Sequence, residues 1–383
     1  MTPNSVADFI REIYRTNEFI ALHEPSFNGN ELSYVTEAIE STYVSSVGKF
    51  VDDFEKKIEI YTGTSKATAT VNGTAALHAA LHVAGVNAGE VVITQALTFV
   101  ATCNVLHHMG VTPAFVDVSK NTMGLCPRAL EIFLGENAVI KENQAYLKKS
   151  QKRIGAVVPM HTFGHPVELD ELVQVCKKWN LVLVEDAAES LGSFYKGRHT
   201  GTIGEYGAVS FNGNKVITTG GGGMVLCSSV GDAKRVKHVT TMSKIPHPYE
   251  FCHDEAGFNY RMPNLNAALG CGQLEGLSAR LLAKRSLAMQ YKEYFSKSNY
   301  LFFDEPTDTR SNFWLNTIIC EDLNARNGFL QRTNSLGVMT RPVWQLMHKS
   351  PMFRNAPRGD LVNSEWFESR VVNIPSSPVN SNN

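Results

Sequence analysis

Hydrophobic residues along the first two-thirds of the chain follow two alternating patterns. Short apolar runs are typical of buried strands, and they occur at 67–71, 91–94, 113–118, 154–160, 181–186, 208–211 and 223–227. Between them, apolar residues recur at helical spacing over 31–41, 51–61, 73–85, 99–110 and 168–180. Strands that alternate with helices predict an α/β fold with a mainly parallel sheet between layers of helices.

Local signals predict where two of these helices begin and end. Asn30 is expected to cap the helix over 31–41, in which Leu32, Val35 and Ile39 form an apolar stripe. Gly63 should end the next helix, because glycine readily adopts the left-handed conformation that commonly closes helices.

The pattern changes in the later part of the chain. Residues 135–153 are polar and lysine-rich, which predicts a surface helix or an insertion. One long helix is predicted over 266–295, followed by a smaller α+β region with a strand at 313–319 and a helix at 327–337. The tail, 376–383, is expected to be disordered.

Length and composition indicate a globular enzyme with two domains. A chain of 383 residues is longer than one ordinary compact domain. We expect a large domain over 1–240, with an N-terminal helical arm, and connector helices plus a small domain over 241–383. A hydrophobic content of 43% is typical of globular proteins. The net charge of −1 gives no general attraction to nucleic acid or membranes, so neither is an expected partner.

The cysteines and the first residues favour the cytoplasm. Seven cysteines are scattered without a CxxC pair, which favours reduced thiols over a disulfide framework, and no metal site is expected. The first 19 residues include acids and lack the apolar core of a signal peptide. No apolar run approaches the length of a membrane span.

Two strand ends place polar groups where such a sheet binds ligands. The strand at 181–186 ends on Asp186, and functional groups of open α/β sheets gather at the carboxyl ends of strands. Gly73 and Thr74 lie at a strand-to-helix junction, where free amides and the helix dipole make an anion site. The plainer interpretations are a loop or capping acid at Asp186 and an ordinary turn at the junction.

Lys215 adds a third chemical group to these two. A lone lysine is usually solvated, but this one stands between two apolar strands and precedes the glycine run 220–223. An anion seat, an acid and a lysine 29 residues after it (215 − 186 = 29) are what a pyridoxal-phosphate (PLP) enzyme needs. The lysine would bind the cofactor aldehyde, Asp186 would pair with the ring nitrogen, and Ser210 would help to hold the phosphate.

At this point a family resemblance is visible. The stretches NGTAAL, TFVAT, PMHTFGHPVELDEL, VEDAAESLGS, SFNGNKVITTGGGG, FNYRMPNLNAALG and TRPVW follow in order between about Leu22 and Ser377. In these motifs the chain resembles the DegT/DnrJ/EryC1/StrS sugar aminotransferases. The resemblance implies the type I, aspartate-aminotransferase-like PLP fold with a smaller C-terminal α+β domain.

The resemblance also implies roles for individual residues. Lys215 and Asp186 would be catalytic, and Phe99 would stack on the cofactor ring. The cofactor phosphate would contact Gly73, Thr74 and Ser210 of one chain and Asn259 of a second chain, in a homodimer with shared active sites. Phe99 could also be an ordinary core residue.

The finer resemblance is to enzymes that aminate a UDP-linked 4-keto-6-deoxy-N-acetylhexosamine, as on routes to bacillosamine and legionaminic acid. EDAAESLGSFYKG, NGNKVITT, GFNYRMPNLNAALG and NIPSS look like that subgroup. Glu189 stands where the wider family usually has Gln, and Gly221 where it usually has Glu; both agree with the subgroup. Glu189 is therefore counted among the cofactor-binding residues, and L-glutamate is the implied amino donor.

Four further residues are candidates for substrate binding: His161, Arg261, Arg341 and Trp344. Arg suits phosphate and Trp suits stacking on a base or sugar. His161 could equally be a satisfied buried histidine, and Arg341 and Trp344 could be interface residues.

Three other functions are compatible with parts of the pattern. The sugar dehydratases of this family usually replace the lysine with histidine, so Lys215 opposes that function. A non-catalytic sensor would not need the full set Lys215, Asp186 and Ser210. A nicotinamide dehydrogenase is disfavoured because the glycine run lacks GxGxxG spacing and leads into a strand.

Overall fold

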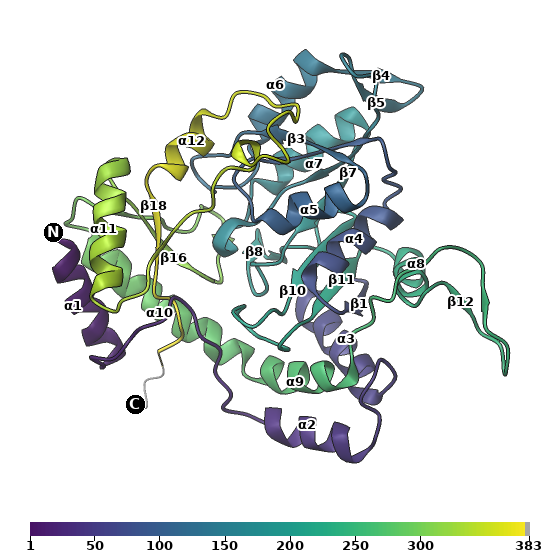
Figure 1. Cartoon of the computed structure of the whole chain (residues 1–383), viewed down its shortest axis with the longest axis horizontal. Coiled ribbons are helices and arrows are strands. Elements are labelled where there is room, and N and C mark those ends of the chain that lie inside the picture. The colour runs from purple at the N-terminus through teal and green to yellow at the C-terminus, as the bar shows by residue number, and fades with distance from the viewer. Residues whose placement is uncertain (380–383) are drawn as a thin grey trace.

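A seven-stranded sheet organises the larger part of the molecule (Figure 1). The structure, a computed structural model, describes residues 1–379 of the chain. The strand order is β1-β11-β10-β7-β6-β2-β3, and only β11 runs antiparallel to its neighbours. The strands are β1 Lys66–Thr70, β2 Val91–Gln95, β3 Thr112–Val116, β6 Ile154–Val158, β7 Val182–Asp186, β10 Tyr206–Ser210 and β11 Gly223–Cys227. The mainly parallel sheet predicted from the sequence is confirmed.

Helices cover both faces of this sheet. Apolar residues of α4, α5 and α8 pack on one face, and those of α3, α6 and α7 pack on the other. The helices are α1 Pro3–Tyr14, α2 Glu31–Glu40, α3 Lys49–Thr62, α4 Gly73–Val83, α5 Val100–His108, α6 Pro127–Asn137, α7 Leu169–Trp179, α8 Val230–Thr240, α9 Asn264–Glu275, α10 Leu277–Phe295, α11 Leu323–Ser335 and α12 Val362–Glu368. Gly63 ends α3 in the left-handed conformation, as predicted.

Only part of the apolar stripe predicted on α2 faces the core. Val35 is partly buried against the core cluster, but Leu32 is 80% exposed and Ile39 is also exposed, whereas Ala38 on the same helix is buried. Asn30 precedes the helix without a side-chain capping bond and instead donates from Nδ2 to Glu275 Oε2 at 2.9 Å. The helix exists where it was predicted, but its predicted cap was wrong, and two of the three stripe residues, Leu32 and Ile39, point away from the core. Apolar residues left exposed in this way are typical of a contact surface.

Two segments differ from their predicted form. The polar segment at 135–153 contains the end of α6 and a two-stranded hairpin of β4 Ala138–Lys141 and β5 Gln144–Leu147, so it is an insertion but not a surface helix. The single helix expected over 266–295 is two helices, α9 and α10, which meet at Gly276.

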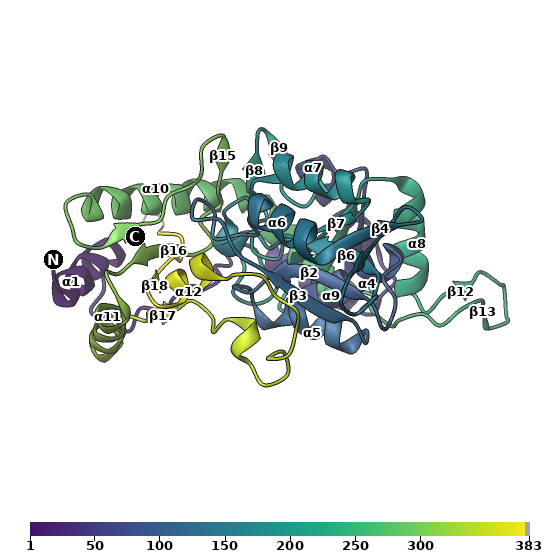
Figure 2. The ribbon, with the colours of Figure 1, turned by 90° about the horizontal axis from the view of Figure 1, so that it is seen from above.

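A second, smaller sheet lies in the C-terminal part, with strand order β14-β16-β18-β17. Its strands are β14 Leu301–Phe302, β16 Asn316–Ile319, β17 Arg341–Pro342 and β18 Val371–Ile374. The strand expected at 313–319 is therefore shorter, and Trp314 precedes it. The N-terminal helix α1 packs here, against residues of α10 and α11, and not on the large sheet (Figure 2).

Short elements complete the fold. Strand β8 Phe194–Tyr195 pairs with β9 Arg198–His199 on one side and with β15 Thr309–Arg310 on the other. The others are the 3-10 turns Thr162–Gly164 and Met347–Lys349 and the projecting hairpin of β12 Lys244–Ile245 and β13 Cys252–His253 (Figures 1 and 2). The predicted disordered tail begins too early, because Ser376 is fully buried; residues 380–383 lie outside the described part of the chain. No helix in the described residues is long and apolar enough to cross a membrane.

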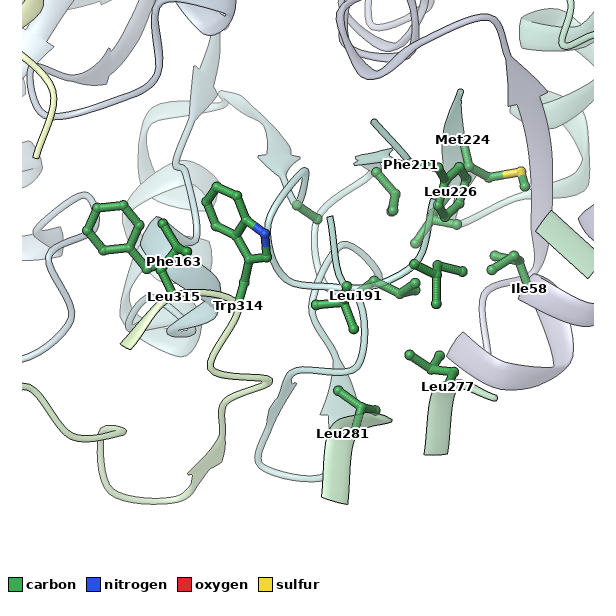
Figure 3. Close-up of a cluster of buried hydrophobic side chains, with 14 of the residues drawn as sticks. Ile58, Phe163, Leu191, Phe211, Met224, Leu226, Leu277, Leu281, Trp314 and Leu315 are labelled. Carbon is green, nitrogen blue, oxygen red and sulfur yellow. The ribbon is translucent and has the colours of Figure 1, made fainter. Parts of the chain in front are cut away.

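One apolar cluster connects the two parts of the molecule (Figure 3). It joins Ile58 of α3 and Leu281 of α10 to strand residues such as Leu226, and it continues to Trp314 and Phe163. Burying these large side chains stabilises the C-terminal part against the sheet. The cluster thereby holds Trp314 at the carboxyl edge of the strands, beside Lys215.

Candidate active site

A cavity of about 850 Å³ lies at the carboxyl ends of the parallel strands. This is the position at which open α/β sheets bind ligands. Nine of the residues predicted from the sequence line it: Gly73, Thr74, Phe99, Asp186, Glu189, Ser210 and Lys215, with Arg341 and Trp344 on the opposite wall. Loops and strands far apart in the sequence thus bring the predicted lysine, acid and anion seat together.

Lys215 is held in a turn just after β10. Its backbone N–H donates to Asn212 at 3.0 Å, and its side chain is 13% exposed. Its Nζ lies 4.1 Å from the centroid of the Trp314 ring and 3.5 Å from Glu189 Oε1. Trp314 is itself fixed by a 2.7 Å hydrogen bond from Nε1 to the Asn214 carbonyl. The amine is therefore positioned by an aromatic face and a carboxyl group.

Asp186 ends β7 as a buried carboxylate. Its Oδ2 accepts a 2.7 Å hydrogen bond from Thr102 Oγ1, and its Oδ1 accepts from the Ala188 N–H at 3.2 Å. Burial raises the pKa of Asp186, and the hydrogen bonds from Thr102 and Ala188 oppose that rise. A buried acid of this kind is stabilised by a cationic partner, such as a protonated ring nitrogen.

The anion seat is formed where the backbone approaches most closely. Asn72 caps α4 by accepting from Ala75 N–H at 2.8 Å, and the amides at the start of the helix have no acceptor within it. A Cβ on Gly73 would lie 2.8 Å from Ser210 Cβ, and one on Gly223 would lie 2.4 Å from the Asn72 carbonyl oxygen. Only glycine fits at these positions, and the close approach that it allows brings the free amides at the start of α4 beside the Ser210 hydroxyl, a combination that suits a phosphate.

Glu189 is a second buried carboxyl in the cavity. Its Oε2 accepts a 2.9 Å hydrogen bond from the Phe163 N–H, and Phe163 itself has a left-handed φ of 56°. Burial raises the pKa of Glu189 to about 7, although the charge of Lys215 opposes the rise. The group can therefore change its protonation near neutral pH.

The opposite wall of the cavity is irregular and partly aromatic. Phe99 is 47% exposed, so the alternative that it is a core residue is wrong. Its ring centroid lies 6.0 Å from that of Trp344, in an edge arrangement. Arg341 is exposed and donates from Nη1 to Thr340 and to Asn334, at 3.0 and 3.1 Å.

His161 is not among the described residues that line the cavity. It is fully buried, its Nε2 lies 2.9 Å from Glu185 Oε2, and its Nδ1 accepts from the Val167 N–H at 3.2 Å. Glu185 also accepts from the amides of Gly201, Ile203 and Gly204. The prediction that His161 contacts substrate is corrected by this geometry: both ring nitrogens are satisfied in the core.

Asn259 and Arg261 also lie away from Lys215. Asn259 is exposed, and Arg261 lines a separate cavity of about 750 Å³ beside the β12–β13 hairpin. Neither residue is among those described residues that line the Lys215 cavity. The chain therefore does not bring Asn259 to its own cofactor site.

Sequence reasoning missed several residues of the site. Thr102, Trp314 and His23 all line the cavity. Both ring nitrogens of His23 are shielded from solvent, and the ring interacts with the backbone of Asn214. Burial, then the charges of Lys284 and Lys215, hold the pKa of His23 well below its usual range. Thr102 could have been found, because it lies in the TFVAT motif; His23 and Trp314 carry no local signal.

Three groups meet at the carboxyl ends of this sheet: Lys215, the buried acid Asp186 and the anion seat at Gly73. Together with the sheet topology they define a PLP enzyme of the type I fold. A family model described as the DegT/DnrJ/EryC1/StrS aminotransferase family matches residues 25–382. The chain belongs to this family, and it is a PLP-dependent sugar aminotransferase.

All seven cysteines are free in the described part of the chain.

Individual relatives agree with this assignment. EpsN of Bacillus subtilis, described as a pyridoxal phosphate-dependent aminotransferase, is 34% identical over 87% of this chain and 84% of its own length. The GDP-perosamine synthase of Escherichia coli O157:H7 is 33% identical over 95% of both chains. The sugar aminotransferase Spr1654 of Streptococcus pneumoniae, in its PLP form, has the same fold with a TM-score of 0.82, at 23% identity over 94% of this chain and 93% of that one.

Proposed function

We propose that the enzyme transfers an amino group from an amino acid, L-glutamate in the first instance, to C4 of a UDP-linked 4-keto-6-deoxy-N-acetylhexosamine. The observation behind this substrate is the resemblance of residues 185–197 and 257–270 to the subgroup that uses it. The polar and aromatic wall at Arg341 and Trp344 is suited to a nucleotide sugar, because Arg pairs with phosphate and Trp stacks on a base or sugar.

The predicted lysine, acid and anion seat would each have a place in this reaction. Bound PLP supplies an electron sink for the negative charge that develops at the substrate carbon. Lys215 would hold the cofactor and, as a free amine, would move the proton at the α-carbon of the donor. Asp186 would keep a proton on the ring nitrogen, and the amides at Gly73 and Thr74, with Ser210, would bind the phosphate. Phe99 would pack against the ring.

We also propose that two chains share each active site. Asn259 is exposed and lies away from the cavity of its own chain, which is what a residue that serves a neighbour requires. Exposed apolar side chains on α2 and at the hairpin, including Leu32, Tyr249 and Phe251, offer a surface for pairing. A two-fold dimer would bury two such surfaces and complete both sites together. We propose separately a large domain over 1–240, whose N-terminal arm α1 packs on the smaller domain over 241–383, and a cytoplasmic location.

A GDP-linked substrate is the second candidate. Its support is the 33% identity to a protein named GDP-perosamine synthase, which is similar over 95% of both chains. The two candidates differ in the base of the nucleotide and in the acetamido group of the sugar. A site that binds an acetamido group leaves buried polar groups unpaired when that group is missing.

Product mass decides between these substrates. The enzyme would be supplied with glutamate and, separately, with UDP-4-keto-6-deoxy-N-acetylglucosamine, GDP-4-keto-6-deoxymannose and dTDP-4-keto-6-deoxyglucose. We expect the mass change of amination with the UDP substrate and a kcat/KM at least about ten-fold higher than with the others, which corresponds to about 1.4 kcal/mol. A higher kcat/KM on the GDP substrate would replace the UDP proposal with the second candidate.

A further inference from the structure

The closest charged neighbour of Lys215 in the cavity is a carboxyl that solvent scarcely reaches. Glu189 Oε1 lies 3.5 Å from Lys215 Nζ, and the Glu189 side chain is only 2% exposed. Its other oxygen is held by the Phe163 N–H. The carboxyl is thus fixed in place with one oxygen directed at the amine.

The charges around this pair depend on the state of the lysine. Asp186 raises the pKa of Glu189 and Lys215 lowers it, while burial is the largest influence. Burial, and then the charges of Lys284 and Lys215, lower the pKa of His23, so this neighbour does not supply a positive charge in place of the lysine. If Lys215 loses its positive charge, Glu189 is left as a buried carboxylate beside a second acid. Such a group is stabilised by taking up a proton.

We propose that Glu189 accepts the proton which Lys215 releases on joining the cofactor, and returns it when the lysine is freed. The inference rests on the proposed role of Lys215 as the cofactor lysine. When the ammonium nitrogen condenses with the aldehyde, a carbon–nitrogen double bond forms and the carbonyl oxygen leaves as water with two of the three ammonium protons. The third proton passes to the Glu189 carboxylate. No oxidation or reduction is involved.

This role distinguishes a carboxyl from an amide at the same position. A glutamine could donate or accept a hydrogen bond there, but it could not store a proton. With Glu189 the net charge of the pair is the same before and after the lysine is attached. The proton also stays within a few ångströms of the amine that will need it again.

Calorimetry of cofactor binding tests the inference without any turnover. The apoprotein is titrated with PLP at pH 8 in two buffers of different ionisation enthalpy and without primary amines, and the difference gives the protons released per subunit. Glu189→Gln should release up to one proton more than the wild type, because its proton goes to solvent. The control Glu168→Gln, which removes a carboxyl outside the cavity, should match the wild type.

A second measurement needs only the wild-type chain. Infrared difference spectra before and after PLP binding at pH 8 should show a new carboxylic-acid C=O band, and labelling with ¹³C-glutamate should shift it. Equal proton release in wild type and Glu189→Gln, or the absence of a shifted band, would overturn the inference. Borohydride reduction separates this failure from a failure of the proposed function. If it fixes PLP on Lys215, only the role of Glu189 is rejected. If it labels a different lysine, the proposed function is rejected as well.

Discussion

Thr102 Oγ1 donates a 2.7 Å hydrogen bond to Asp186 Oδ2, which links the start of α5 to the end of β7. The bond favours the charged form of a carboxyl whose pKa burial raises. A residue 84 positions earlier in the chain therefore positions Asp186 and opposes the rise in its pKa.

The first prediction concerns this bond. Thr102→Val keeps the shape of the side chain but removes the donor, so kcat/KM should fall about ten-fold or more, since a hydrogen bond to a charged group contributes about 1.5–3 kcal/mol. Thr94→Val is the control, because it removes a buried hydroxyl that donates to the Val158 carbonyl, outside the cavity. Steady-state kinetics of both variants would show whether the loss is specific; equal losses would argue against a role for Thr102 in the site.

The second prediction is that Asp186→Asn folds but loses most transamination. An amide cannot keep the ring nitrogen protonated as a carboxylate does, so we expect a loss of at least about 100-fold, or about 2.7 kcal/mol in the barrier. Circular dichroism and PLP content would establish that the variant is folded and loaded. Near-normal turnover in a loaded Asp186→Asn enzyme would disprove the role proposed for Asp186.

The third prediction assigns the covalent attachment. Borohydride reduction of the holoenzyme, followed by peptide mapping, should place the pyridoxyl group on Lys215 and nowhere else. Lys284 is the informative comparison, because burial lowers its pKa to about 7 and gives it a neutral amine near neutral pH. Its Nζ is fully buried and donates to the carbonyls of Trp314 and Ser376, so it should remain unlabelled.

The fourth prediction tests the shared site. Lys215→Ala and Asn259→Ala chains are each inactive if both residues are needed in every site. In a mixed dimer one site carries both changes and the other carries neither. Equal mixing should therefore restore about a quarter of the wild-type activity, because half of the dimers are mixed and each has one intact site. Activity that does not recover, in mixtures shown to exchange subunits, would mean that each chain builds its own site.

The fifth prediction follows from Lys284. Its folded-state pKa, about 7, is below the value of an unfolded lysine, so between the two the unfolded chain binds more protons. The stability that the group contributes is lost as the pH falls toward 7 and is fully present only above the unfolded pKa. Lys284→Met removes this dependence, which is at most about 1.4 kcal/mol per pH unit. The difference in melting temperature, Lys284→Met minus wild type, should be most positive at pH 7.5 and should fall by pH 9.5; parallel curves would contradict the assignment.

Local sequence signals were sufficient to place the sheet and the polar residues at its strand ends. The positions of Asp186, Ser210 and Gly73 could be predicted because each stands at a junction between an apolar strand and a polar turn. The outward direction of Leu32 on α2 could not be predicted, because periodicity locates an apolar stripe without saying what covers it.

Other features depend on contacts between distant segments. His161 has the composition of a site residue, but its partner Glu185 lies 24 positions later, and only the fold shows that the two satisfy each other. The ring of Trp314 approaches Lys215 from nearly 100 positions away, through packing of the C-terminal part against the sheet. The β4–β5 hairpin was missed because its polar, lysine-rich composition is also typical of a solvated helix.

The crowding at Gly73 has a consequence for anyone who wishes to redesign this enzyme. A side chain at Gly73 would meet Ser210 Cβ at 2.8 Å, so the anion seat has no room for variation. The facing wall, from Met339 to Gln345, is built largely from irregular chain and presents Arg341 and Trp344 to the same cavity. Libraries aimed at a new sugar or a new nucleotide should therefore vary this wall and leave the seat untouched, so that acceptor choice changes while cofactor loading does not.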